Sequence, residues 1–198
     1  MGKNKIEMLE DVVPGHNDKE VLKSPIPEVR TPGIEGFQFL TIYPNWMKSI
    51  KTRKFNNMLK DESTFAKNMY ICLSKLIPTI NKESDKIFKK NNGKIKDFSY
   101  SGFSHCHLIC DEKKVNLFYS ICYEIHGQSF KNVTEGDEDY NWYQLGVSGS
   151  IRIIGIYSSI NNVFYPLFID WNLLVYPSVK HNQIDYKKFK FDPYARYK

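Results

Sequence analysis

The amino-acid sequence predicts an α+β fold in which helices pack on a C-terminal antiparallel β-meander. Stretches before residue 127 repeat apolar residues at helical spacing, and after residue 141 apolar runs of strand length alternate with short polar turns. Helices and sheets that are apolar on one face bury those faces against each other. The chain has 198 residues, the usual length of one domain. We therefore expect residues 37–198 to form a single α+β domain.

Residues 1–36 differ from the rest of the chain because they are rich in proline and glycine and show no sustained apolar period. Proline restricts its own backbone and pushes the preceding residue toward extended conformations. We expect these residues to form an extended arm.

A strand and then a helix are predicted directly after the arm. Residues 37–43 are dense in aromatic and β-branched side chains and end at Pro44, which is typical of a strand. Residues 45–60 set apolar side chains among basic ones at broadly helical spacing. This spacing predicts a helix over 45–60.

Two further helices are predicted on either side of Pro78. Ser63 is a favourable N-cap, and apolar residues follow it at steps of three and four until Pro78 stops the pattern. Residues 80–91 place apolar side chains on one side and lysines on the other, with Gly93 just past the end. We therefore expect one helix between Ser63 and Pro78 and a second over residues 80–91.

The helix from Asp111 to His126 has clear signals at both ends. Asp111 is a favourable N-cap, and Gly127 supplies a C-terminal stop. Apolar side chains between them share one face, which we expect to pack on the sheet. His126 lies where a protonated imidazole suits the helix C-terminus, so we interpret it as a capping residue.

The last third of the chain predicts the β-meander. Compact polar segments at 148–150 and 158–162 have hairpin length, so consecutive strands should pair antiparallel. The predicted strands cover residues 142–147, 151–157, 163–169 and a short fourth piece at 173–176.

Charge and cysteine usage narrow the class of protein. The 28 Lys and Arg residues exceed the 22 Asp and Glu residues, giving a net charge of +6. This excess favours an anionic partner, such as RNA or another nucleic acid or an acidic protein, as well as a plain solvated surface. The four cysteines lack paired CxxC spacing, and no apolar run approaches the roughly 20 residues of a membrane span. We expect a cytoplasmic protein with reduced thiols and no membrane partner.

His105 and His107 form the densest cluster of chemistry-bearing residues. In an extended segment, residues two apart project to the same face, so the two imidazoles could share a phosphate or act as acid and base. They could also be two unrelated histidines near the end of a strand. Third and fourth zinc ligands are missing from the pattern, so we expect neither a metal nor a cofactor.

Arg152 is the one arginine in the predicted sheet region, and isoleucines flank it. An arginine in an apolar strand either faces solvent across the sheet or is placed to hold an anion. Both interpretations stay open from the sequence.

Two basic segments are candidates for binding nucleic acid. The tail, residues 180–198, alternates cations with aromatic rings, as a single-strand surface requires, although its rings could instead anchor it on the sheet. The candidate cations are Lys187, Lys188, Lys190 and Arg196 in the tail and Lys51, Arg53 and Lys54 near the N-terminal side of the domain.

The runs Ser150–Tyr157, Asn162–Asp170 and Leu174–Pro177 resemble the terminal strands of RelE/ParE-superfamily bacterial toxins. In that family an "(Y)RI" strand is followed by an apolar strand and a closing piece with tyrosine. The resemblance spans residues 150–177, about one seventh of the chain. It implies mRNA cleavage by basic and aromatic side chains without a metal, with Arg152 as the phosphate-holding arginine and Tyr176 as the closing tyrosine.

Two functional classes therefore stay open. The first is an RNA-binding protein of the RelE-like toxin type, acting as a metal-independent endoribonuclease through His105, His107, Arg152 and Tyr176, with an antitoxin as protein partner. The second is a non-catalytic phage or mobile-element protein that binds and inhibits a host protein, with Trp46, Trp142 or Trp171 at its interface. The first class requires both histidines to lie near Arg152 in space.

Overall fold

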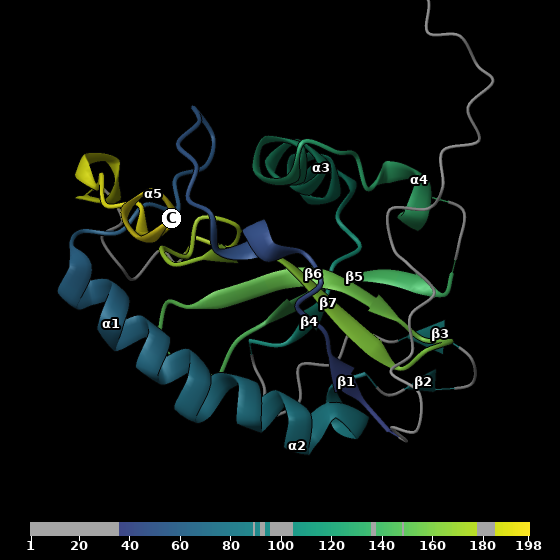
Figure 1. The fold of residues 1–198 in the computed structure, drawn as a ribbon. Coiled ribbons are helices and arrows are strands. Elements are labelled where there is room, and N and C mark those ends of the chain that lie inside the picture. Colours follow the sequence, from purple (N-terminus) through teal and green to yellow (C-terminus); the bar gives the residue numbers. More distant parts are fainter. Residues whose placement is uncertain are drawn as a thin grey trace, which may run out of the picture.

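The computed structural model describes residues 36–88, 90–91, 94–95, 105–135, 138–147, 149–177 and 185–198. The predicted arm, residues 1–36, lies outside this part of the chain except for Gly36. Helices and a mixed five-stranded sheet make up the described residues, so the predicted α+β class is confirmed (Figure 1).

The five-stranded sheet has the order β1-β7-β6-β5-β4. β4 to β7 pair antiparallel with their neighbours, whereas β1 runs parallel to β7. A separate two-stranded sheet is formed by β2 (Lys90–Asn91) and β3 (Lys94–Ile95). The strands of the main sheet are β1 (Gln38–Phe39), β4 (His107–Leu108), β5 (Tyr140–Leu145), β6 (Arg152–Ser158) and β7 (Val163–Asp170).

The predicted three-strand meander is present as β5, β6 and β7, but the predicted strands on either side of it need correction. The first strand contains only two residues of the seven expected. The fourth piece, 173–176, is not a strand, because Leu173 has a positive φ of 58° and the chain turns there. The sheet is also mixed, since β1 joins it in parallel.

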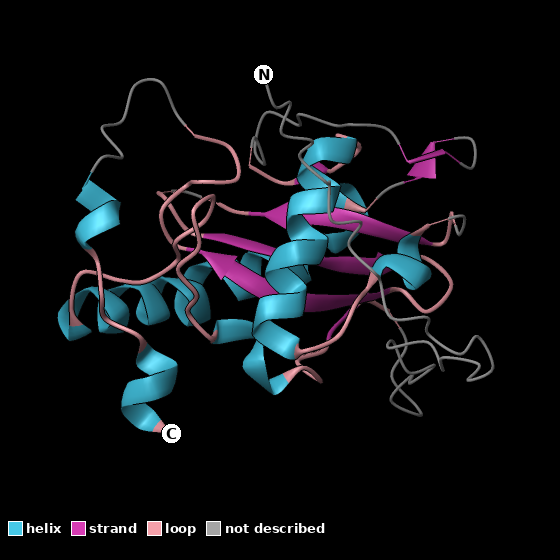
Figure 2. Cartoon of the chain, turned by 90° about the horizontal axis from the view of Figure 1, so that it is seen from above, coloured by secondary structure: helices cyan, strands magenta, loops and turns pink. Residues whose placement is uncertain are grey.

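Helices cover both faces of the sheet (Figure 1). α3 (Glu112–His126) lies over one face, and Figure 2 shows it crossing the strands. α1 (Glu62–Ile71) and α2 (Ile77–Ile87) lie under the other face. Two groups of buried side chains result, one containing Phe118 of α3 and the other containing Ile80 of α2.

α1 and α2 form one continuous helix, so the predicted break at Pro78 is wrong. Residues Cys72–Leu76 form a π-helical turn between them, and Pro78 lies in the first turn of α2. Proline lacks the N–H of a regular turn, and a widened turn before it absorbs that loss. Asp61 is the N-cap in place of Ser63, because its carboxylate accepts a bond of 2.8 Å from Thr64 N–H. The helix ends at Ile87 rather than at 91.

The predicted helix over 45–60 is also wrong. Only Pro44–Met47 is helical, as the 3₁₀ helix η1, and an irregular loop follows. Asn57 is fully buried in that loop, where its side-chain oxygen accepts from Ile50 N–H at 2.7 Å and its amide donates to the Ile169 carbonyl at 2.9 Å. These bonds hold the segment against β7, and local spacing does not reveal them.

The prediction for α3 is confirmed at both ends. The Asp111 carboxylate accepts from Lys113 N–H and Lys114 N–H, and Gly127 adopts the left-handed conformation with φ 71°. The His126 ring nitrogen Nε2 lies 2.7 Å from the Leu167 carbonyl oxygen, so this histidine ties α3 to β7 in addition to its place at the helix end. A short helix, α4 (Lys131–Thr134), follows.

The structure shows the surroundings of the tryptophans and the cysteines and the character of the helices. Trp46, Trp142 and Trp171 are all buried, so they are unsuited to the protein interface expected for the second functional class. All four cysteines are free thiols, and Cys110 alone among them is exposed. Across the described residues, no helix combines the length and the apolar character that crossing a bilayer requires.

Gly155 marks a bulge in the pairing of β6 with β7 and cannot carry a side chain without backbone movement. A Cβ atom there would lie 2.1 Å from the Tyr165 carbonyl oxygen and 2.8 Å from the Phe164 ring. We expect Gly155→Ala to lower the free energy of unfolding by about 3 kcal/mol, because overpacking the core forces the two central strands apart. Urea denaturation followed by circular dichroism measures this loss.

Gly127→Ala serves as the comparison for that prediction. A Cβ at Gly127 meets nothing within 4 Å, so the cost is limited to the left-handed backbone, about 1 kcal/mol. Equal losses in the two variants would contradict the close approach at Gly155.

Candidate functional site

A row of polar side chains crosses one end of the sheet on the face that α3 covers. His107 of β4 pairs with Gln144 of β5, which in turn pairs with Ile154 of β6. Arg152, two residues before Ile154, pairs with Asp170 of β7. Paired residues and residues two apart share a face of a sheet, so the four polar side chains share a face with Ile154, which belongs to the core on the α3 side.

This row borders a pocket of about 370 Å³. The four residues predicted to act in catalysis all line it, although they come from three separate segments of the chain. The lining consists of His105, His107, Gln144, Gly149, Ser150, Arg152, Leu173 and Tyr176. The structure therefore brings both histidines to the same site as Arg152.

Arg152 is only 4% exposed, so the interpretation that it faces solvent is wrong. Its Nη1 group donates to the carbonyls of Gly149 at 2.9 Å and Ile151 at 2.8 Å. Among the described residues, no hydrogen-bond partner is found for its Nε and Nη2 groups. Since guanidinium stays charged, these N–H donors suit an anion in the pocket.

Gly146 shapes the path of the Arg152 side chain. A Cβ at Gly146 would lie 2.8 Å from Arg152 Cδ and 2.9 Å from its Nη1 atom. The absence of a side chain therefore leaves the room in which the arginine turns toward the pocket.

Asp170 is fully buried beside Arg152 and organises the turn after β7. Its carboxylate accepts from Asn172 N–H at 3.0 Å and Val175 N–H at 2.8 Å. Burial raises the pKa of Asp170 to about 6, although the backbone donors and the Arg152 charge act in the opposite direction. At neutral pH the carboxylate is thus ionised and balances the arginine, while its turn carries Leu173 and Tyr176 to the pocket.

The two histidines reach the pocket in different ways. His107 lies in β4, whereas His105 lies in a turn just before this strand, so the predicted extended geometry applies only in part. Burial, followed by the nearby charges of Arg152 and His107, lowers the pKa of His105. The His105 imidazole is therefore neutral at neutral pH and can accept a proton.

Tyr176 closes one side of the pocket and connects it to α3. Its ring lies 6.1 Å from the His107 ring, centroid to centroid, and the Lys114 Nζ atom stands 3.2 Å from the Tyr176 ring centroid. Burial lowers the pKa of Lys114, and Asp111 partly offsets that effect. This cation–π contact places a second positive charge beside the site.

Sequence reasoning missed Lys114 and Gln144. Nothing in the pattern of the helix separates Lys114 from its exposed neighbours. Gln144 carries a usable signal, because it is an amide among apolar and aromatic neighbours in a predicted strand. It is 2% exposed, and its Oε1 atom is buried without a hydrogen-bond partner.

The predicted nucleic-acid-binding cations gather elsewhere. Lys51 Nζ donates to the Lys187 carbonyl at 2.8 Å, so the basic loop and the tail lie side by side. Arg53 and Lys54 line a second hollow of about 530 Å³, together with Lys113 of α3. Lys187, Lys188, Lys190 and Arg196 are exposed in the tail. None of these cations belongs to the described lining of the histidine pocket.

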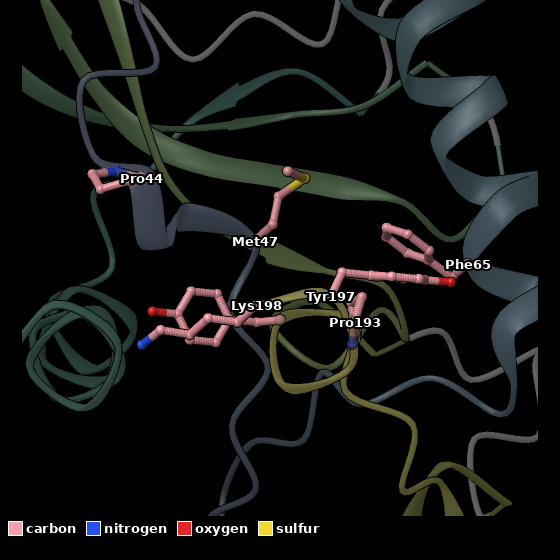
Figure 3. A pocket seen from close by; sticks show the side chains of 7 residues that line it. Pro44, Met47, Phe65, Pro193, Tyr197 and Lys198 are labelled. Atoms are coloured by element: carbon pink, nitrogen blue, oxygen red, sulfur yellow. The ribbon is translucent and has the colours of Figure 1, made fainter.

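The tail is anchored on α1 rather than on the sheet. Phe191 forms a bridge with Leu59, and its ring lies 6.3 Å from the Phe65 ring of α1. In α5 (Pro193–Tyr197), the Tyr197 ring lies 5.9 Å from the same phenylalanine. Figure 3 shows Phe65 and Tyr197 at the apolar groove of about 310 Å³ between α1, η1 and the tail. Both rings thus contribute to packing the C-terminus.

No cluster of three His, Cys, Asp or Glu side chains that could hold a metal ion is found in the described part of the chain.

Comparisons with known proteins identify one relationship. The family described as "Uncharacterised protein UU032" matches residues 41–198. The chain is also 32% identical over 155 residues to "Uncharacterized protein UU032" from Ureaplasma parvum serovar 3 (strain ATCC 700970), and the match covers 78% of each chain. No solved structure matches significantly.

The electrostatic coupling within the pocket can be measured on His105. The Arg152 guanidinium disfavours protonation of this imidazole, so Arg152→Gln should raise the pKa of His105 toward its ordinary value. NMR titration of the histidine ring protons follows that pKa. Lys67→Ala, which removes one exposed positive charge from α1, is the control and should leave it unchanged. An unmoved His105 pKa in Arg152→Gln would show that the two groups are not coupled.

The burial of Asp170 gives a second, pH-dependent prediction. Its folded-state pKa of about 6 exceeds the ordinary 3.8, so the folded state binds the proton more tightly, and stability from this group falls as pH rises from about 4 to 6. The difference in unfolding free energy between the native protein and Asp170→Asn should shrink by about 2 kcal/mol over that range.

Asp61 is the comparison, because its contribution to stability should change with pH in the opposite direction. Bonds from Thr64 lower the pKa of its carboxyl, so Asp61→Asn should remove stability that is present at neutral pH and lost in acid. Urea unfolding at pH 4 and pH 7 measures the Asp170 difference, and unfolding at pH 2.5 and pH 5 measures the Asp61 difference, because that stability is lost only below about pH 4. A parallel response of the two variants would contradict the burial effect at Asp170.

Proposed function

The chain belongs to the UU032 family, and we propose that it binds RNA and cleaves the strand at the His105–His107–Arg152 pocket without a metal. The observation that carries this proposal is the convergence of two imidazoles and a buried guanidinium on one pocket, from segments about 45 residues apart in sequence. These groups are the ones that phosphodiester cleavage by acid–base chemistry needs.

Phosphate binding is assigned to Arg152. Its Nε and Nη2 donors, which have no partner in the described part of the chain, form a planar fork that matches two phosphate oxygens. The side chain is 4% exposed, and charge-assisted bonds gain strength where water is excluded. The Lys114 ammonium above the Tyr176 ring adds positive charge at the rim.

Proton transfer is assigned to the histidines. The neutral His105 imidazole takes the proton of the ribose 2′-hydroxyl as its oxygen attacks phosphorus. His107 donates a proton to the leaving 5′-oxygen, and Arg152 stabilises the charge on the pentavalent phosphate. The P–O5′ bond breaks as the bond from the 2′-oxygen forms, which leaves a cyclic phosphate and a free 5′-hydroxyl.

The remaining support for RNA is the surface charge and the resemblance to RelE/ParE toxins. Lys51 lies beside Lys187 of the tail, and Arg53 and Lys54 line the second hollow with Lys113 of α3. Such cations can bind phosphates without regard to sequence. The resemblance assigns roles to Arg152 and Tyr176, and both line the pocket. An acidic protein fits the surface charge but leaves the paired histidines without a role.

Purified protein incubated with a fluorescent RNA should produce fragments with cyclic phosphate ends. His105→Ala, His107→Ala and Arg152→Gln should each slow cleavage by about 100-fold or more, the usual contribution of a positioned acid or base. Because burial lowers the pKa of His105, the acidic limb of the rate profile should lie below pH 6.5. Gel electrophoresis with mass spectrometry of the products measures both.

Lys67→Ala is the matched control, because it removes one positive charge outside the pocket. RNA that binds but stays intact under varied pH and salt would remove the catalytic part of the proposal. Cleavage that persists in all three pocket variants would place the chemistry elsewhere or in a contaminant.

A further inference from the structure

Gln144 lies on the floor of the pocket with an acceptor that nothing in the described chain satisfies. The residue is 2% exposed, it lines the pocket, and its Oε1 atom has no hydrogen-bond partner. Burying a polar atom without a partner destabilises a protein, so such atoms in folded chains need an explanation. The proposed cleavage of RNA assigns no role to this amide.

The strand pairing defines what surrounds the amide. Gln144 pairs with His107 on one side and with Ile154 on the other, and Arg152 lies two residues from Ile154 on the same face. Adjacent strands are about 4.8 Å apart, and diagonal neighbours about 7 Å. The pocket floor therefore offers guanidinium donors and a neutral carbonyl acceptor a few ångströms apart, with an imidazole on the far side of the acceptor.

Such a floor matches an anionic group whose close neighbour is a hydrogen-bond donor. A phosphodiester alone supplies only acceptors, so it can bind Arg152 but leaves the Gln144 oxygen unpaired. In a ribonucleotide, the 2′-hydroxyl is on the carbon next to the one that carries the 3′-phosphate. The amino groups of the bases lie farther from the phosphate, on the other side of the sugar.

We propose that Gln144 accepts a hydrogen bond from the ribose 2′-hydroxyl next to the phosphate held by Arg152, and so selects RNA over DNA. This inference rests on the proposed function. The 2′-hydroxyl is the group by which a protein distinguishes the two nucleic acids, and a deoxynucleotide leaves the buried oxygen unsatisfied. A hydroxyl has one hydrogen, so this bond belongs to the bound ground state, and the hydroxyl turns from the Gln144 oxygen to His105 when cleavage begins.

The test compares two ligands that differ by one hydroxyl and cannot be cleaved. Isothermal titration calorimetry is run with adenosine 3′-monophosphate and 2′-deoxyadenosine 3′-monophosphate. The native protein should bind the ribonucleotide at least about fivefold more tightly, as expected when one ligand leaves a buried acceptor unpaired. Gln144→Leu should bring that ratio close to one while the deoxynucleotide affinity is kept.

Matched variants separate recognition from folding. Gln38→Leu makes the same change at a buried glutamine of β1 outside the pocket, and the ratio should be retained. Arg152→Gln should weaken both nucleotides by similar factors. If Gln144→Leu does not fold, Gln144→Asn, which keeps a shortened amide, and the native ratio itself still test the inference.

The outcomes distinguish the two proposals. Equal affinity of the native protein for both nucleotides, with loss of both in Arg152→Gln, overturns the role of Gln144 and leaves the phosphate site intact. A Gln144→Leu variant that keeps the ratio also overturns it. Failure of both nucleotides to bind overturns the phosphate site and this inference together.

Discussion

The buried charge pair between β6 and β7 is the constraint on which the candidate site depends. Arg152 and Asp170 face each other across the two strands, almost completely removed from water. Removing one member of a buried pair costs roughly 3–5 kcal/mol, and bonds to the backbone also offset the burial of both residues. Asp170 also holds the turn that brings Tyr176 to the pocket, while Arg152 keeps donors free for an anion. The same two residues therefore organise the end of the sheet and polarise the pocket.

The pocket is assembled at the point where the sheet stops being apolar. Over most of the sheet, the face under α3 is covered by core side chains such as Phe118 and Trp142. At the end of the sheet, the row from His107 to Asp170 replaces them with polar groups. The first turn of α3 covers this end through the contact of Lys114 with Tyr176. The sheet and the first turn of α3 thus fix the polar side chains beside the pocket.

Elements with local signals were predictable, and elements held by distant contacts were not. α3 has its cap and its stop within its own residues, and β5, β6 and β7 are separated by turns of hairpin length. The loop after η1 resembles a helix in spacing, yet Asn57 holds it against β7 through a bond to Ile169, 112 positions away. Pro78 looks like a stop, but a π-helical turn accommodates it.

For the candidate site, residue type and position in a strand were sufficient to select His105, His107 and Arg152, because charged or titratable groups in apolar surroundings need a reason. Whether these residues meet depends on strand order and register, which bring β4 and β6 to opposite sides of β5. The role of Gln144 depends on the same register, since the function of an amide in a strand cannot be inferred until the residues on the neighbouring strands are known. The sequence by itself thus selects the polar residues that are candidates for the site, and long-range hydrogen bonding between strands brings them together in one pocket.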